Sequence, residues 1–464
     1  MVKTAAATIW TPRLRADSGP VYLAIADALE ADIANGRLAQ GTRLPAQRAL
    51  AERLGINFTT VTRAYDEARG RGVLTSKVGQ GTFVRSRASS RTALSAEGRV
   101  DLTMNLPPRF SDPALVSRLW RDIASLEEAG GLNLLLQYQA PGGSAEDRQA
   151  AAEWLRPRLP DIAVDRLVIA PGAQSALFAI ATSLAAPGDT IAAENLCYPG
   201  FRALAAQARL TLAPVAMDEQ GLLPEALENV CQQKKPKALY LTPTLHNPTT
   251  ATMSLARRQA VIAVARRNSL LLIEDDAYGM LAERAPPPLA ALAPDITWHV
   301  AGLAKCLSPA LRLAYCAAPD PRAALRLSAA IRAIAAMTSP LTAAIARNWI
   351  ENGTAAQLLS AIRRESAERR ALAVRLLPPA QFRGSDGFHL WLTLPARWTR
   401  GEFLARLTPL GIGAVPSDAF ALSAPPEALR LGLGAPRTKD ELAHGLAVIA
   451  DLLGEAPALS SGVV

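Results

Sequence analysis

The sequence predicts an α/β protein, with a mostly parallel sheet between helices, that follows a winged helix-turn-helix domain at the N-terminus. From Asp101 onward, short apolar runs typical of strands alternate with Ala-rich runs typical of helices. Before that point, three short helical patterns are followed by one alternating pattern that turns at glycines. The length of 464 residues suits two or three domains rather than one.

The first helix is predicted within "PVYLAIADALEADIANGRL", where apolar residues recur at helical spacing until Asn35-Gly36 ends the pattern. Two further helices, in "LPAQRALAERLG" and "NFTTVTRAYDEARGRG", are joined by Gly55-Ile56, which is typical of a helix-turn-helix. "VLTSKVGQGTFVR" then alternates and turns at Gly79 and Gly81. This hairpin is the predicted wing.

Basic residues are concentrated in this first region. Residues 1–92 hold 14 Lys or Arg against 7 Asp or Glu, which places +7 of the formal net charge of +9 there. Such an excess indicates double-stranded DNA as the partner, with the second helix of the pair in the major groove. A solvated basic surface is the alternative explanation of the charge, and a protein-binding winged helix is the alternative function of the fold. The expected DNA contacts are Arg48, Asn57, Thr59, Thr60, Thr62, Arg63, Lys77 and Gln80.

The predicted domains are a DNA-binding domain at 1–85, a flexible linker at 86–100 and a larger domain at 101–464. The linker contains "SRASSRTALSAEGR", which is small, polar and basic, with no apolar period. Within the larger domain we expect a large subdomain at about 130–330 and a small C-terminal subdomain at 331–464.

Composition disfavours several protein classes. The N-terminus lacks a signal-peptide pattern, and the long uncharged run at 167–188 contains prolines and glycines, so a cytoplasmic protein without a membrane span is expected. Four cysteines without CxxC spacing predict reduced thiols. Four histidines without a shared spacing predict no metal site.

In open parallel sheets, ligands bind beyond the carboxyl ends of the strands. Five strand-like runs in the larger domain are followed by groups with binding or catalytic chemistry. Taken singly, each group has a structural explanation as a turn, a helix cap or a surface residue. Together they are the parts needed to hold pyridoxal 5'-phosphate. These groups are Ala173 and Gln174, Tyr198, Asn247, Asp275 and Tyr278, and Lys305 followed by Arg312.

Lys305 decides this interpretation because it lies in the otherwise uncharged run "TWHVAGLAKCLSPAL". A buried, unpaired ammonium group is costly, so such a lysine tends to lose its proton and become a nucleophile. Lys305 is therefore expected to form the Schiff base with the cofactor aldehyde, and Asp275 to keep the pyridine nitrogen protonated.

The other groups are expected to position the cofactor. Asn247 and Tyr278 would bond the ring oxygen, and Tyr198 would stack on the ring. The phosphate would be held by Arg312, Gln174 and the amide of Ala173. Lys305, Asp275 and Tyr278 are the candidate catalytic residues.

The first region resembles the DNA-binding domain of the GntR family of bacterial transcription regulators. The resemblance covers residues 20–85 and is carried by the LPxxR element, "TTVTRAYDEA" and "GQGTFV". One residue departs from the family pattern. Phe58 stands where many relatives have an arginine that touches DNA, so the resemblance does not supply the operator sequence.

The larger domain resembles the fold type I aminotransferases, in the branch near aromatic and aminoadipate aminotransferases. The motifs are in family order and include "YQAPGGSAEDR", "TPTLHNPT", "EDDAYG" and "AKCLSPALRLAY". The resemblance implies that Tyr138 reaches the phosphate of a neighbouring subunit in a homodimer, and that Arg430 clamps a substrate carboxylate. Thr250 replaces a glycine that is common in the family.

A GntR domain joined to an aminotransferase-like domain is the arrangement of the MocR subfamily of regulators. This resemblance implies a transcription regulator that senses an amino compound, or pyridoxal phosphate itself, through Lys305. Two alternatives stay open on the sequence alone. The first alternative is a working aminotransferase that transfers an amino group between an amino acid and a 2-oxo acid. The second is a DNA-binding protein with an inactive cofactor domain.

Overall fold

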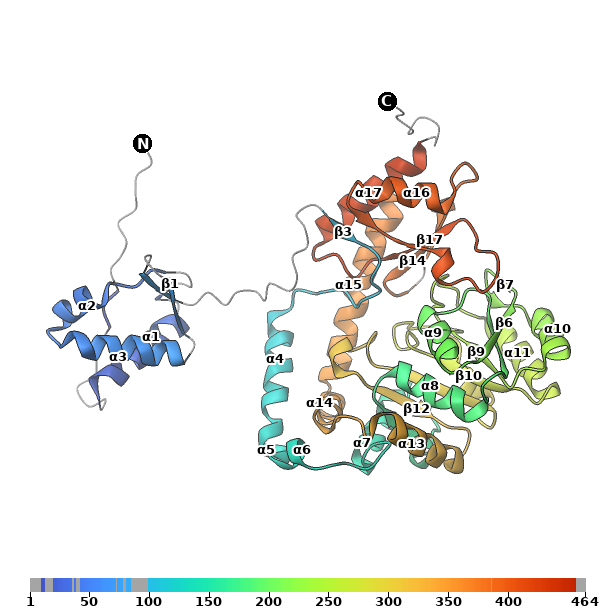
Figure 1. Ribbon diagram of the computed structural model, residues 1–464, viewed down its shortest axis with the longest axis horizontal. Coiled ribbons are helices and arrows are strands. Elements are labelled where there is room, and N and C mark those ends of the chain that lie inside the picture. Colours follow the sequence, from blue (N-terminus) through green and yellow to red (C-terminus); the bar gives the residue numbers. More distant parts are fainter. Residues whose placement is uncertain are drawn as a thin grey trace. The chain divides into compact units, whose positions relative to one another are not determined.

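The computed structural model of the chain describes residues 10–12, 20–35, 37–38, 42–71, 73–77, 81–84, 99–384 and 386–455. The chain divides into two compact units, Met1–Ala96 and Glu97–Val464, each with its own buried core (Figure 1). Residues 86–98 of the predicted linker lie outside the described residues.

The first unit is a winged helix-turn-helix, as predicted. Helix α2 ends at Gly55, whose φ of 62° needs no strain in a glycine, and Asn57 caps the next helix. The buried Tyr65 hydroxyl donates a hydrogen bond to the carbonyl of Pro45 at 3.0 Å. The wing strands pair antiparallel, with Leu74 opposite Val84. The elements are α1 (Val21–Ala34), α2 (Gln47–Leu54), α3 (Phe58–Gly70), β1 (Leu74–Lys77) and β2 (Gly81–Val84).

The second unit is built on a seven-stranded sheet. Strand β12 runs opposite to the other six strands of this sheet, which are parallel to one another, and this confirms the prediction of a mostly parallel sheet. The order across the sheet is β4 (Leu167–Ala170), β12 (Ala314–Ala317), β11 (Thr297–Gly302), β10 (Leu271–Asp275), β9 (Ala238–Leu241), β5 (Thr190–Glu194) and β6 (Thr211–Val215).

Helices cover both faces of this sheet because alternate strand residues face opposite sides. Leu167 and Ile169 pack into one core, whereas Val168 and Ala170 pack into another. One face is covered by α7 (Ala145–Leu155), α10 (Pro224–Lys234), α11 (Leu255–Arg267), α12 (Leu289–Leu292) and α14 (Pro340–Glu351). The other face is covered by α8 (Ala173–Leu184), α9 (Pro199–Gln207) and α13 (Pro321–Ala335).

A smaller C-terminal sheet has a core of its own. Val100 and Leu102, from the start of the unit, pack into this core as well. The sheet order is β13 (Phe382–Arg383), β14 (His389–Thr393), β17 (Ala428–Gly432) and β16 (Val415–Pro416), with α16 (Arg400–Leu407) and α17 (Lys439–Gly454). Four two-residue strands form two further pairs in the described part of the unit. These are β3 (Val100–Asp101) with β15 (Ile412–Gly413), and β7 (Met217–Asp218) with β8 (Gly221–Leu222).

The long helix α15 (Thr354–Leu376) joins the two cores. Leu358 and Ile362 pack into the core of the large sheet, whereas Ala373 packs into the small one. The core therefore changes within this helix, later in the chain than the boundary predicted at 331. The reason is the length of α15, which at about 34 Å reaches across both cores.

Three helices lie along the chain between β3 and α7. They are α4 (Pro113–Ala124), α5 (Leu126–Gly130) and α6 (Asn133–Leu136), which follow one another in Figure 1. Among all described helices, none is both long enough and apolar enough to cross a membrane.

Candidate functional site

A cavity of about 480 Å³ lies at the carboxyl ends of the strands of the large sheet. Residues from five strand ends meet there, together with a residue of β17 from the small sheet. Nine of the predicted cofactor and substrate residues line it: Ala173, Gln174, Tyr198, Asn247, Asp275, Tyr278, Lys305, Arg312 and Arg430.

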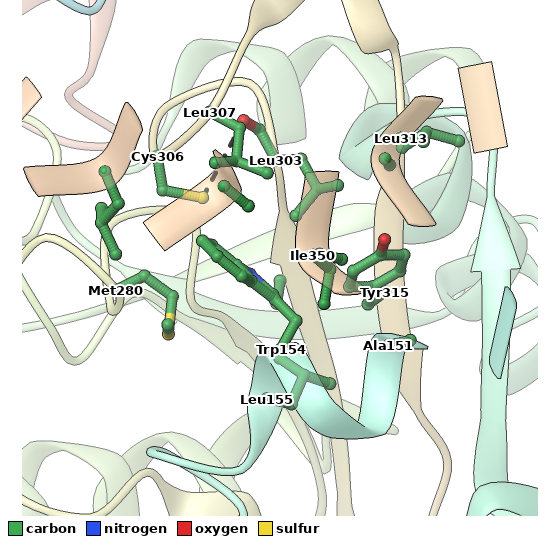
Figure 2. Packing of buried hydrophobic residues seen from close by; sticks show 14 of the residues in the cluster. Ala151, Trp154, Leu155, Met280, Leu303, Cys306, Leu307, Leu313, Tyr315 and Ile350 are labelled. Atoms are coloured by element: carbon green, nitrogen blue, oxygen red, sulfur yellow. Dashed lines mark hydrogen bonds between the residues drawn. The ribbon is translucent and has the colours of Figure 1, made fainter. Parts of the chain in front are cut away.

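Lys305 is placed at the cavity by the packing of its neighbours. Figure 2 shows Leu303, Cys306 and Leu307 within the hydrophobic core on one face of the large sheet. The half-buried Lys305 donates a hydrogen bond from Nζ to the carbonyl of Asn105. Burial, aided by the positive charge of Arg430, lowers the pKa of Lys305 to about 8. Near neutral pH, part of this lysine is therefore an unprotonated amine.

Asp275 ends β10 and carries a carboxylate with one free oxygen. Its Oδ2 accepts a hydrogen bond from the Tyr240 hydroxyl at 2.9 Å, whereas the buried Oδ1 has no partner among the described residues. Burial raises the pKa of Asp275 to about 6, against the opposing effect of the Tyr240 hydrogen bond. An unpaired carboxylate oxygen beside a cavity suits a cationic N–H group of a ligand.

Neutral hydrogen-bonding groups lie near these two charges. The Tyr278 hydroxyl accepts a hydrogen bond from Nδ2 of Asn105 at 2.8 Å, and burial raises its pKa, so the phenol stays protonated. The buried Oδ1 of Asn247 has no partner among the described residues. The Tyr198 ring lies so close to Gly200 that a Cβ there would come within 2.4 Å of it.

The start of α8 lies at one end of the cavity. Gly172, with φ of 90°, precedes Ala173, and a Cβ at Gly172 would lie 3.4 Å from the Arg312 guanidinium group. The free N–H groups of the first helical turn suit a phosphate. One difference from the sequence expectation concerns Gln174, because its Nε2 donates to the carbonyl of Gly200 at 2.6 Å. One of its amide hydrogens is therefore engaged within the protein.

Arg430 and Tyr138 complete the predicted set. Arg430 is buried on β17 and donates from Nη2 to the carbonyl of Thr103, while its Nε has no partner in the described part of the chain. Tyr138 does not line the cavity and is 87% exposed. Its contact with a neighbouring subunit stays a prediction.

The predicted DNA contacts gather on α2 and the first turns of α3, within the first unit. Arg48, Asn57, Thr59 and Arg63 are exposed, and Thr60 and Thr62 are half-buried. Lys77 ends β1, whereas Gln80 lies outside the described residues.

Comparison with known proteins assigns both units. Residues 21–84 match the family model for bacterial regulatory proteins of the gntR family, and residues 99–449 match that for aminotransferases of class I and II. An uncharacterised HTH-type transcriptional regulator of Bacillus subtilis, YdeF, is 31% identical over 453 residues, which cover 96% of this chain and 97% of the relative. The chain belongs to the MocR-type regulators of the GntR family.

This MocR-type regulator has further informative relatives. The vitamin B6 salvage pathway transcriptional repressor PtsJ of Salmonella typhimurium is 28% identical over 418 residues, covering 88% of this chain and 93% of the relative. A crystal structure of the α-aminoadipate aminotransferase LysN from Thermus thermophilus, complexed with N-(5'-phosphopyridoxyl)-L-leucine, has a TM-score of 0.70 and 25% identity. That alignment covers 78% of this chain and 94% of LysN.

The MocR-type regulator is thus a DNA-binding protein with pyridoxal 5'-phosphate as its cofactor. The cavity fits this group on structural grounds. The unpaired Oδ1 of Asp275 suits the pyridine N–H, and the first turn of α8 with Arg312 suits the phosphate. The amine of Lys305 opens to the same cavity.

Several residues of the site were not predicted. Asn105 bonds both Lys305 and Tyr278, and Tyr240 bonds Asp275. Asn105 comes from a loop 200 residues before Lys305, and no spacing in the sequence points to it. Tyr240 lies within the run "KALYL", where a tyrosine looks like any other buried strand residue.

A buried ionic network behind Asp275 was also missed. Asp276 accepts hydrogen bonds from Nε of Arg158 at 3.2 Å and lies 3.1 Å from Nε2 of His299. Burial would raise the pKa of Asp276, but the charges and hydrogen bonds of Arg158 and His299 outweigh it and lower that pKa to about 2. Asp276 was visible in the motif "EDDAYG", but Arg158 carried no signal.

Proposed function

We propose that the aminotransferase-like domain of this MocR-type regulator is a sensor that registers an amino compound, or the cofactor itself, at Lys305. One observation carries the proposal. The amine of Lys305, with its pKa lowered to about 8, shares a cavity with the unpaired Oδ1 of Asp275. A nucleophilic amine and a buried acid in one pocket are what covalent capture of a pyridine aldehyde requires.

Pyridoxal phosphate, when bound, supplies an aldehyde that condenses with a primary amine, with loss of water, to a C=N bond that a second amine is able to exchange. Lys305 provides the first amine in unprotonated form. Asp275 would hold a proton at the pyridine nitrogen, and Tyr278 and Asn247 would bind the ring oxygen. Arg430 keeps a spare N–H for the carboxylate of an entering amino acid.

The cofactor itself is one candidate effector. PtsJ is named as a repressor of a vitamin B6 salvage pathway, and that relative aligns with 88% of this chain. A regulator of this kind would bind DNA differently with and without the cofactor. An amino acid that competes with Lys305 for the aldehyde is the other candidate.

A homodimer is part of the proposal. Large apolar side chains are exposed on and after α4 and α6, including Trp120 at 68%, Leu136 at 71% and Tyr138 at 87%. Exposed apolar groups of this extent mark interaction surfaces, and we propose a second copy of the chain as their partner. An effector would change DNA binding only if it binds the two arrangements of the dimer with different affinity.

The test is borohydride reduction of the holoprotein, followed by peptide mass mapping and measurement of DNA affinity. We expect a pyridoxyl adduct on Lys305, none in Lys305→Ala, and an unchanged adduct in the control Lys439→Ala, an exposed lysine of α17. Reduction fixes the link, so reduced protein should no longer respond to added amines. Colourless protein after reconstitution, without an adduct at Lys305, would show that the cofactor domain is inactive.

A second candidate function, transamination, is favoured by Arg430, which lines the same cavity as Lys305 and whose Nε has no partner in the described part of the chain. The three groups predicted for the reaction and for the substrate carboxylate, Lys305, Asp275 and Arg430, line this one cavity. Incubation of purified protein with an amino acid and a 2-oxo acid distinguishes the two functions. Multiple rapid turnovers would make the protein an enzyme first, whereas a single exchange without turnover supports the sensor.

A further inference from the structure

The first turn of α3 presents an apolar side chain among the predicted DNA contacts. Phe58 is the first residue of α3 and is 41% exposed. Single exposed apolar residues are common on protein surfaces and need no explanation by themselves. This one has polar neighbours whose hydrogen-bonding groups are already engaged.

The polar side chains of this turn build the turn itself. Oδ1 of Asn57 accepts hydrogen bonds from the backbone N–H and the hydroxyl of Thr59, both at 2.9 Å. An asparagine that reads adenine needs its carbonyl and its amide group together, so base reading by Asn57 would break this cap. The Thr62 hydroxyl lies 3.0 Å from Oε1 of Gln47 and 3.1 Å from the carbonyl of Phe58. It is therefore engaged in joining α2 to α3.

A cation holds the aromatic ring in place. The guanidinium group of the exposed Arg48, on α2, lies 5.6 Å from the centre of the Phe58 ring. A cation over an aromatic face is attracted by the ring, which restricts the rotamers of both side chains. The two helices of the helix-turn-helix thus share a surface that is apolar at its centre and positive at its edge.

We propose that Phe58 reads a thymine by contact with the 5-methyl group of that base in the major groove. Among the four bases, thymine alone presents a methyl group there, and apolar side chains contact it. Arg48 would lie beside the same base step, near a phosphate. The operator should then carry T at one fixed position in each site that α3 contacts. The inference rests on the proposed placement of α3 in the major groove.

The test uses the full-length protein with pyridoxal phosphate and a duplex selected from a random pool by the wild type. Each thymine of that duplex is replaced singly by deoxyuridine, which keeps base pairing and removes only the methyl group. Affinity is measured by fluorescence anisotropy at one salt concentration. At one position, deoxyuridine should weaken wild-type binding about fourfold, the factor expected for burial of one methyl group.

Three variants assign this methyl contact. Phe58→Ala should bind the thymine and deoxyuridine duplexes equally, whereas Phe58→Leu should keep part of the difference. Thr59→Ser removes a methyl group from the next predicted DNA contact and tests whether Thr59 makes the methyl contact instead. The control is Val21→Ala, at an exposed apolar residue of α1 outside the predicted DNA contacts, and it should discriminate as the wild type does. Phe58 is exposed, so these variants should keep the thermal stability of the wild type.

The outcomes separate the inference from the function on which it rests. If the wild type binds its selected duplex tightly but ignores every deoxyuridine, the thymine contact is wrong and DNA binding stands. If Thr59→Ser, and not Phe58→Ala, loses the discrimination, the contact belongs to Thr59 and the inference is also wrong. If no duplex is recovered, the placement of α3 fails and the inference fails with it.

Discussion

The two units build their sites in opposite ways. The predicted DNA contacts come from one stretch of the chain, from Arg48 to Gln80, and Arg48, Asn57, Thr59 and Arg63 among them are exposed. The cofactor cavity draws on residues from Thr103 to Arg430, and two of its charged groups, Asp275 and Arg430, are buried. Burial is what shifts the pKa values of Lys305 and Asp275 away from their ordinary range. The chemistry of the exposed DNA contacts therefore depends on where these residues lie on the surface. The chemistry of the buried cavity, whose residues come from distant segments, also depends on the dielectric and the charges around it.

The largest effect is expected where the buried site holds paired charges. Asp276→Ala leaves the buried Arg158 without its carboxylate partner. The free energy of unfolding of the aminotransferase-like unit should therefore fall by about 3–5 kcal/mol. The transition of the winged helix should be unchanged, and calorimetry separates the two. The double variant Asp276→Leu with Arg158→Met should recover part of the loss, because no unpaired charge remains. If Asp276→Ala lowers the free energy of unfolding by less than about 1 kcal/mol, the buried pair of Asp276 and Arg158 does not stabilise the fold as described.

The pH dependence of this pair follows from the lowered pKa of Asp276, about 2 in the folded protein. A carboxyl whose pKa is lowered by folding contributes stability above its unfolded pKa of about 4 and loses it as the pH falls. The contribution of Asp276 should therefore fade between about pH 4 and pH 2. In Asp276→Ala this part of the acid sensitivity should be absent.

Asp275 should show the reverse behaviour, because burial raises its pKa to about 6. Its ionised form then costs stability above pH 6, and the apoprotein should gain stability as the pH falls from about 6 to 4. At pH 7.5, Asp275→Asn should stabilise the apoprotein by up to about 3 kcal/mol and weaken retention of pyridoxal phosphate. Denaturation of the apoproteins at both pH values measures the first effect, and visible absorption after dialysis measures the second. An asparagine variant that is less stable than the wild type would contradict this account of the carboxylate.

In the winged helix, Arg63→Ala should weaken DNA binding about tenfold and lower the salt slope by about 1, because one contact of a cation with a phosphate is lost. Cofactor content should not change. The guanidinium group of Arg63 lies 4.3 Å from the centre of the Tyr22 ring, and this contact restricts the Arg63 side chain. Arg375→Ala, an exposed arginine of the other unit, is the charge-matched control and should bind DNA as the wild type does. Equal salt slopes for Arg63→Ala and the wild type would remove Arg63 from the DNA-contacting face.

The smallest effect concerns the backbone beside Asn247. Thr250 has φ of 64°, a left-handed conformation that strains a β-branched residue by about 1–2 kcal/mol. Thr250→Gly removes this strain and adds unfolded-state entropy, so stability should change by no more than about 1 kcal/mol. Thr249→Gly is the matched control, and it should be more destabilising because the Thr249 hydroxyl contacts Nδ1 of His246 at 2.8 Å. If the two glycine variants are equally unstable, strain at Thr250 is not significant.

Sequence reasoning succeeded where a motif specifies its local structure. The winged helix, the mostly parallel sheet and the cofactor were predicted and are confirmed. Nine predicted site residues line one cavity because strand ends in a parallel sheet meet at one edge, which brings Asp275 and Lys305 near each other. Asn105 and Arg158 were missed because no periodicity relates them to the strands that they contact. Gln174 was assigned to the phosphate alone, since the carbonyl of Gly200 near its amide is not visible in the sequence.

The order of residues by itself determined the two kinds of domain, the basic charge of the first and the amine and acid of the second. Those properties follow from short-range patterns and from residue chemistry, which a chain carries before it folds. Only the tertiary structure decided which carboxylate oxygen stays unpaired, which cations share a buried network, and that Phe58 is exposed beside Arg48. Burial and hydrogen-bond partners are set by contacts between distant segments, and these contacts exist only once the cores have formed.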